Sequence, residues 1–259
     1  MRTLLKGLGI IPLLTLYILV SGIIHLIPAR RNIKRVVAIR TTSAFARIAL
    51  ILLGIRVHVK HSDLLRKAGK GRLIVSNHLS YVDVLVLASL IPSVFTTSVE
   101  LRNTVLLGTL ARLSGSIFVE RRRPSGLKQE IEVIAIALDQ GLPVVLFPEG
   151  TTSNGDRVHP FKNSLFESAF MAHADILPVC LHYSRVNQER LTPHNRDNVF
   201  YYGGVSFGKH LFRLLSLASG DVEVVPLKAV KAHLGLSRKD LATATHDAIS
   251  AAYSGHEAQ

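Results

Sequence analysis

The sequence predicts an α/β fold, with a mixed, mostly parallel sheet covered by helices on both faces and a membrane-associated segment of two helices in front of it. Short apolar runs alternate with longer stretches of helical periodicity after Gly54. The run 143–147 is wholly apolar, as strands buried on both faces are. Residues 7–28 carry no formally charged side chain.

The first segment, 7–28, is long enough to cross the apolar part of a membrane as a helix, which takes about 20 residues. Basic residues flank it: Arg2 and Lys6 before, and Arg30, Arg31, Lys34 and Arg35 after. Because the excess of positive charge follows the segment, we expect an inner-membrane anchor with the next domain in the cytoplasm. A cleaved signal peptide is the alternative, and Pro12 and His25 also allow a helix that enters one leaflet and returns.

Residues 32–54 continue as an amphipathic helix that bears arginines, which is typical of a helix at a membrane interface. The alternative is an ordinary helix packed on the core. We therefore divide the chain into an anchor with its interfacial helix (1–54), a main domain (55–254) and a loose tail (255–259).

Within the main domain, strands and helices alternate. Strands are expected at 55–60, 72–76, 94–99, 116–120, 143–147, 176–183 and 222–226. Helices are expected at 81–90, 106–113, 127–140, 164–173 and 237–253. Gly141 closes one helix, and Ser237 with Asp240 caps the last. Loops at the carboxyl ends of the strands are the expected positions of the site.

The composition limits the partners. The net charge of +13 implies an anionic partner, which could be nucleic acid, an anionic membrane surface or a phosphorylated or acyl-carrier substrate. Nucleic acid is disfavoured because Trp is absent, aromatic residues are sparse and no known binding module is present. The single cysteine, Cys180, excludes an internal disulfide and cysteine-rich metal sites, and its apolar surroundings indicate a buried thiol.

The central stretch of the sequence is Ser76–Asp83, in which an apolar strand ends at Asn77-His78 and a turn leads to a helix with Asp83 in its first turn. The carboxylate can hydrogen-bond one ring nitrogen of His78, fix its tautomer and leave the other nitrogen as a base. No Gly-x-Ser-x-Gly elbow occurs, so the activated hydroxyl can belong to the substrate. The alternative is that Asn-His only caps the helix.

Three further motifs follow. In Gly115–Arg121, Arg121 ends a strand and can hold a phosphate through two parallel hydrogen bonds. In Phe147–Ser153, Glu149 needs a partner at the end of a buried strand, for which Arg121 is a candidate. Gly150 permits close backbone approach there. The fourth motif is 176–179, in which Pro178 indicates an edge or an entrance of the sheet.

Asn77–Asp83 resembles the His-x4-Asp motif of the glycerolipid acyltransferase family, and the three further motifs resemble the other motifs of that family, in the same order. The similarity covers roughly residues 35 to 230 and is greatest to bacterial 1-acylglycerol-3-phosphate (lysophosphatidic acid) acyltransferases. It implies acyl transfer from acyl-CoA or acyl-carrier protein to the free hydroxyl of 1-acylglycerol-3-phosphate, giving phosphatidic acid in phospholipid biosynthesis. The implied partners are these substrates and anionic membrane lipids, with no metal, redox cofactor or nucleic acid.

The resemblance also implies a role for each matching residue. His78 is the general base, and Asp83 orients it. The acceptor's phosphate or head group binds at Asn77, Arg121, Glu149, Gly150, Thr151, Thr152 and Ser153. The acyl or acceptor channel is lined by Phe118, Ile176, Pro178 and Val179, with Phe118 and Phe147 supporting the site rather than doing chemistry.

Two departures from the family pattern lie near the inferred head-group site. Thr152 stands where many members have Arg, and Asn163-Ser164 stands where many have Gly. Another lysophospholipid or a lyso-ornithine lipid is therefore an alternative acceptor. An alternative of another class is a membrane-anchored binding protein that has lost its chemistry, which the intact His78, Asp83, Arg121 and Glu149 disfavour.

Overall fold

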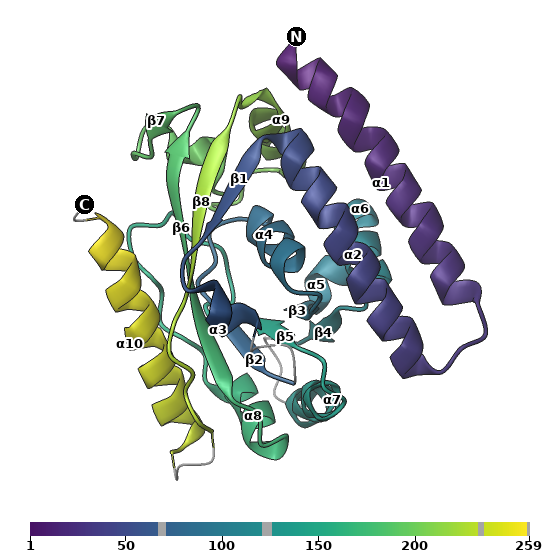
Figure 1. Ribbon diagram of the computed structural model, residues 1–259, viewed down its shortest axis with the longest axis vertical. Coiled ribbons are helices and arrows are strands. Elements are labelled where there is room, and N and C mark those ends of the chain that lie inside the picture. The colour runs from purple at the N-terminus through teal and green to yellow at the C-terminus, as the bar shows by residue number, and fades with distance from the viewer. Residues whose placement is uncertain (67–70, 121–125, 233–235, 258–259) are drawn as a thin grey trace.

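The structure is a computed structural model that describes residues 1–66, 71–120, 126–232 and 236–257. The chain begins with a hairpin of two long helices, α1 (Arg2–Leu26) and α2 (Arg31–Leu53), which lies along one side of the sheet (Figure 1). Gly54 ends α2 with a left-handed conformation (φ 72°), in which its missing side chain avoids the carbonyl oxygen of Ala218. The chain then enters the sheet directly.

The sheet has the strand order β1-β8-β6-β2-β5-β3-β4, and β7 pairs with β6. The strands are β1 (Ile55–Val59), β2 (Leu73–Ser76), β3 (Val94–Ser98), β4 (Ile117–Val119), β5 (Val144–Leu146), β6 (Ile176–Val186), β7 (Glu189–Arg190) and β8 (Gly220–Pro226). Only β6 with β7 and β6 with β8 pair antiparallel among the described strands. The predicted mixed, mostly parallel sheet is confirmed.

Helices cover the sheet from both sides. These are α3 (Ser62–Arg66), α4 (Val82–Leu90), α5 (Val99–Arg102), α6 (Val105–Leu113), α7 (Leu127–Asp139), α8 (Glu167–Met171), α9 (Phe207–Ser216) and α10 (Arg238–Glu257), with short 3₁₀ turns at Ser164–Phe166 and Arg196–Asn198. In Figure 1, α4, α2 and α1 stack outward on one side, and α10 packs against β6 on the other. The central strands β2 and β5 are buried on both faces, which explains why all their residues except Ser76 are apolar.

Much of the apolar surface of the hairpin is exposed rather than packed against the rest of the protein. Both helices are long and apolar enough to cross a membrane by length and composition. Exposed apolar side chains run along both helices: Leu4, Leu5, Leu8, Ile11, Leu16, Leu19, Ile23, Leu26, Ile33, Val37, Ile48 and Ile51. The inner face of α2 packs on α4. Helix α2 therefore packs on the domain through one face and exposes apolar side chains on another, so it has features of both alternatives expected for it.

The structure corrects two expectations and extends others. Pro178 lies in β6, an inner strand between β8 and β2, not at an edge. A proline fits there because the ladder with β8 begins at Val179, one residue later, and the Pro178 carbonyl still accepts a hydrogen bond from the Leu227 N–H. Helix α10 continues to Glu257, so residues 255–257 are helical rather than loose. Helices α3, α5 and α9 were not anticipated.

Candidate active site

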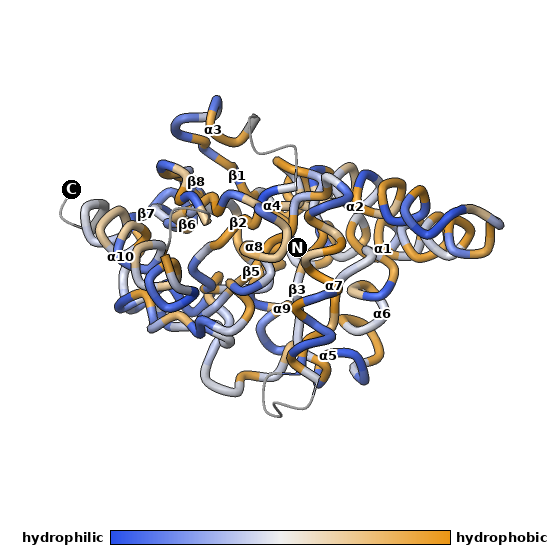
Figure 2. The backbone as a smooth tube through the Cα atoms, turned by 90° about the horizontal axis from the view of Figure 1, so that it is seen from below, coloured by the Kyte–Doolittle hydropathy of each residue, from blue (hydrophilic) through white to orange (hydrophobic). Residues whose placement is uncertain are grey.

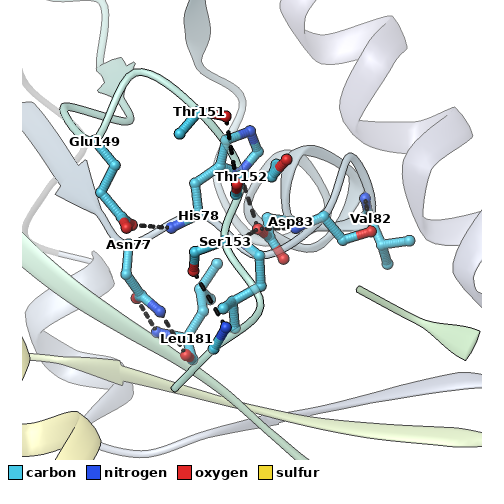
Figure 3. Close-up of polar contacts among 12 residues, drawn as sticks. Asn77, His78, Val82, Asp83, Glu149, Thr151, Thr152, Ser153 and Leu181 are labelled. Atoms are coloured by element: carbon cyan, nitrogen blue, oxygen red, sulfur yellow. Dashed lines mark hydrogen bonds and ion pairs between the residues drawn. The ribbon is translucent and has the colours of Figure 1, made fainter. Parts of the chain in front are cut away.

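His78 lies two residues after the end of β2, at the carboxyl end of the parallel strands, where the site was expected. Its Nδ1 lies 2.9 Å from Oδ2 of Asp83 (Figure 3). The imidazole stacks on the ring of Phe147, with the ring centroids 4.0 Å apart and the planes 15° from parallel. About 18% of the side chain is exposed. The ring is therefore fixed by a carboxylate on one edge and an aromatic face, and it still reaches the surface.

Asp83 is fully buried in the first turn of α4, and four donors surround its carboxylate. Oδ2 accepts hydrogen bonds from His78 Nδ1, from the Leu79 N–H at 2.7 Å and from the Ser80 N–H at 2.9 Å. Oδ1 accepts a 2.7 Å hydrogen bond from the hydroxyl of Tyr183 on β6. A buried carboxylate is stable when it is hydrogen-bonded in this way, so Asp83 can hold Nδ1–H in place and leave Nε2 as the basic nitrogen.

The Tyr183 hydroxyl is a permanent donor in this network. Burial and the neighbouring Asp83 carboxylate raise the pKa of Tyr183 well above its ordinary value. The phenol therefore keeps its proton at every pH at which the protein works. Sequence reasoning missed this residue, although the parallel pairing of Ser76 with Val179 carries β6 past the end of β2 toward the His78 loop.

Glu149 follows β5 and links two loops through backbone hydrogen bonds. Oε1 accepts from the His78 N–H at 2.7 Å, and Oε2 accepts from the His159 N–H at 2.9 Å. Burial, with a smaller contribution from the Asp83 carboxylate, raises the pKa of Glu149 to about 7, against the opposing effect of these two hydrogen bonds. Glu149 thus fixes the backbone at His78 itself. Its expected partner, Arg121, lies outside the described residues.

Asn77 holds the other side of the same loop. It is 1% exposed, its Nδ2 donates to the Leu181 carbonyl at 2.9 Å, and its Oδ1 accepts from the Leu181 N–H at 2.8 Å. Both polar ends of the amide are therefore used to join β2 to β6. We had expected Asn77 in substrate binding, and the geometry instead makes it a structural clamp for the His78 loop.

The loop after Glu149 closes over the His78 loop. The Ser153 N–H donates to the His78 carbonyl at 3.0 Å, while Thr151 is exposed and Thr152 half-buried. Gly150 has a φ of 77°, and a Cβ there would lie 3.0 Å from Nζ of Lys162. Gly150, Thr151 and Thr152 thus lie beside His78, as expected for an acceptor site, and Lys162 places an ammonium group next to them that sequence reasoning had not assigned.

The predicted channel residues on β6 lie at different distances from this loop cluster, with Val179 nearest because it pairs with Ser76. Ile176, Pro178 and Val179 are buried in the inner strand β6, and Ile176 pairs with Leu73 at the end of β2 that is remote from His78. Phe118 lies on the edge strand β4, with the guanidinium carbon of Arg102 4.7 Å above its ring. The structure brings together His78, Asp83 and Glu149, with Val179 two residues from the Asn77 partner Leu181 and Ile176 at the remote end of β2.

This arrangement places a carboxylate-held histidine at the carboxyl ends of parallel strands, which is a geometry suited to a general base. The family model described as Acyltransferase matches residues 56–182. The chain is 33% identical over 202 residues to the lyso-ornithine lipid O-acyltransferase of Rhizobium meliloti, which is 75% of this chain and 68% of that protein. The protein of the same name from Brucella abortus is 34% identical over 192 residues, 71% of each chain.

Two further comparisons agree with the class. The 1-acyl-sn-glycerol-3-phosphate acyltransferase of Neisseria gonorrhoeae is 29% identical over 154 residues, 60% of this chain and 58% of that protein. The crystal structure of the 1-acyl-sn-glycerophosphate (LPA) acyltransferase PlsC from Thermotoga maritima has the same fold, with a TM-score of 0.71, 20% identity and coverage of 100% of this chain and 97% of that one.

The chain belongs to the acyltransferase family. It is an O-acyltransferase that acts on lysolipids, and it uses a lysolipid acceptor and an acyl donor. The two apolar N-terminal helices and the membrane-lipid enzymes among its relatives associate it with a membrane.

Proposed function

We propose that His78 acts as the general base in direct acyl transfer from a thioester to the free hydroxyl of a lysolipid. Nε2 removes the hydroxyl proton, and the alkoxide oxygen attacks the thioester carbonyl. The new C–O bond forms, the C–S bond breaks, and the proton passes from the imidazolium to the departing thiolate. Asp83 stabilises the imidazolium through Nδ1–H. No covalent acyl-enzyme and no metal or redox cofactor take part.

One observation carries this proposal: His78 is held on Nδ1 by Asp83, while the ring remains partly exposed. Within the described ranges, no hydrogen bond between residues occupies Nε2. A histidine that merely capped α4 would direct a side-chain acceptor to the first backbone N–H groups of the helix, whereas here the Asp83 carboxylate receives the N–H groups of Leu79 and Ser80. The imidazole is left for chemistry.

We propose 1-acylglycerol-3-phosphate as the acceptor, with acyl-CoA or acyl-carrier protein as the donor. The order of the four motifs and the similarity to the Neisseria protein support it. Thr151, Thr152 and the Lys162 ammonium beside Gly150 supply hydrogen-bond donors and a positive charge for a phosphate at this site. Arg121, to which the family resemblance gives the same role in phosphate binding, is also part of this proposal.

A second acceptor, lyso-ornithine lipid, has support of its own. Four relatives with 31–34% identity carry the name lyso-ornithine lipid O-acyltransferase. Thr152, half-buried beside the catalytic loop, replaces the arginine that many phosphatidate-forming members have there. Because a hydroxyl lacks the positive charge and the paired donors of a guanidinium, threonine at this position makes the site less selective for an acceptor that carries a phosphate.

The location follows from the anchor. We propose that residues 1–54 hold the domain of residues 55–254 at the cytoplasmic face of the inner membrane, where lysolipid acceptors and anionic lipids meet the basic surface.

The experiment that identifies the acceptor offers labelled acyl-CoA and acyl-carrier protein to the purified full chain in liposomes, with lysophosphatidate, lyso-ornithine lipid and another lysophospholipid in parallel. A kcat/KM at least tenfold higher for lysophosphatidate supports the first acceptor, and the same preference for lyso-ornithine lipid replaces it with the second.

A further inference from the structure

A cavity of about 300 Å³ lies beneath the N-terminal hairpin, at the opposite side of the sheet from the helix α10. Its lining comes from the start of α2, the end of α5, the edge strand β4 and the first half of α7. Two strands, β5 and β3, separate β4 from β2, which places the two strands roughly 14 Å apart at the usual strand spacing. The cavity is therefore distinct from the loop cluster around His78.

Three arginines dominate this lining. Arg31 and Arg35 lie one helical turn apart at the start of α2, and Arg102 ends α5. Among the described lining residues the only carboxylate is that of Glu130, whose Oε1 accepts a hydrogen bond from the Glu120 N–H. Positive charge is thus in excess, and no ion pair between described residues neutralises any of the three guanidinium groups.

Local structure fixes two of these arginines in place. Arg102 stacks on the face of Phe118, with its guanidinium carbon 4.7 Å from the ring centroid. Arg35 packs its stem on the turn before β4, where Cγ lies 3.6 Å from the position that a Cβ on Gly115 would take. Gly115 has a φ of 77°, so the backbone of this turn favours a glycine. Stacked and packed arginines lose little freedom when they bind an anion.

The start of α2 adds to the positive field. The helix has no side-chain cap and no acidic residue in its first turn, so its free backbone N–H groups and the helix dipole act in the same direction as Arg31 and Arg35. Helices usually begin with a residue whose side-chain oxygen accepts a hydrogen bond from one of the first backbone N–H groups. A phosphate oxygen in the cavity would supply one, and it would accept parallel hydrogen bonds from guanidinium groups.

The position of the cavity indicates where the phosphate comes from. The hairpin turn next to Arg31 exposes Leu26, Ile27 and Ile33, with 83%, 52% and 55% of each side chain accessible. Figure 2 shows the hairpin as a mostly hydrophobic arm with hydrophilic segments of α2 near its tip. Because these apolar side chains belong at the membrane, the cavity beside them faces the head-group layer of the bilayer.

We propose that this arginine cavity binds the head-group phosphate of one anionic membrane phospholipid, separate from the substrates of the reaction. Arg31, Arg35 and Arg102 would hold the phosphate, and the acyl chains of the lipid would follow the exposed apolar faces of α1 and α2. The bound lipid would complete the start of α2 and fix the hairpin against α5 and β4. This inference is independent of which lysolipid the enzyme acylates.

The test is native mass spectrometry of the full chain, released from mixed micelles of phosphatidylglycerol and phosphatidylcholine. Wild type should retain one phosphatidylglycerol per protein. The double variant Arg35→Gln/Arg102→Gln should weaken retention by about 25-fold, at roughly fivefold per arginine. The matched control, Arg40→Gln/Arg213→Gln, removes the same charge from exposed positions outside the cavity and should stay within twofold of wild type.

Three results would overturn the proposal. Equal losses of retention in the double variant and its control would indicate only diffuse electrostatic attraction, and equal retention of phosphatidylcholine would show no preference for an anionic lipid. Displacement of the lipid by coenzyme A would assign the cavity to the phosphates of the acyl donor. Melting curves followed by circular dichroism check the fold of each variant. Arg102→Gln alone, at an exposed side chain, gives a second reading that does not depend on the packing of Arg35; it should lower retention about fivefold, and wild-type retention would contradict the site.

Discussion

The hydroxyl of Tyr183 donates a 2.7 Å hydrogen bond to Oδ1 of Asp83, across 100 residues of sequence. With it, every oxygen of the buried carboxylate that orients His78 has a donor, and the chain His78–Asp83–Tyr183 runs from the site surface into the core. This contact makes β6 part of the candidate active site as well as of the sheet.

Tyr183→Phe should lower kcat about tenfold with little change in KM, because it leaves Oδ1 of Asp83 buried without a donor and loosens the carboxylate that holds His78. Steady-state kinetics on the purified variant measure both constants. Tyr202→Phe is the matched control, since it removes an exposed hydroxyl bonded to Asp197. Wild-type kcat in a folded Tyr183→Phe protein would show that Asp83 does not depend on this contact.

Asn77→Ala should act on stability. It removes both hydrogen bonds to Leu181 and leaves the backbone groups of that residue unpaired in the core, at a cost of about 1–3 kcal/mol for each buried group. Chemical denaturation with intrinsic tyrosine fluorescence measures the loss. If Asn77 instead bound substrate, as the sequence suggested, the free energy of unfolding would stay near wild type and KM would rise.

The stability of the folded protein should fall as the pH rises from about 4.5 to about 7, through the titration of Glu149. Burial raises its pKa to about 7 in the folded state, whereas the unfolded chain releases this proton near 4.5. Between the two values the folded state binds more protons, so raising the pH favours unfolding, and the effect is complete above the folded pKa.

Glu149→Gln removes this titration, so the difference in unfolding free energy between wild type and variant should change across that pH range and level off above it. The glutamine amide also keeps only one acceptor, so one of the two backbone N–H groups, of His78 or His159, loses its partner. A difference that is constant from pH 4.5 to 8 would mean that Glu149 is ionised throughout and that its two hydrogen bonds outweigh its burial.

The sequence was sufficient for the order of all the longer strands and most of the helices because its strongest signals are local. Apolar runs became the inner strands β2 and β5 and the first part of β6. The cap formed by Ser237 and Asp240 is present, with the Asp240 carboxylate accepting from the Ser237 N–H at 2.9 Å. The pairing of His78 with Asp83 was also predictable, because both lie in one turn.

Contacts between distant segments could not be predicted in the same way. Tyr183 reaches Asp83 only through the parallel register of β6 on β2, and Asn77 finds Leu181 through the same register. The family resemblance implied a channel along 176–179, and the central place of β6 in the sheet buries Ile176 and Val179 in the core. Of the two positions expected for Pro178, the edge is wrong because β6 is an inner strand, whereas the entrance fits because the ladder with β8 begins one residue later, at Val179.

The most direct test of the account is the turnover of His78→Ala, measured as acyl transfer from labelled acyl-CoA to the preferred lysolipid in liposomes. The account predicts that kcat falls by about 10²–10⁴, while the melting temperature and binding to liposomes stay near wild type. His194→Ala, which removes an exposed imidazole elsewhere, should keep its activity. Wild-type turnover in a folded, membrane-bound His78→Ala protein would contradict the assignment of His78 as the base.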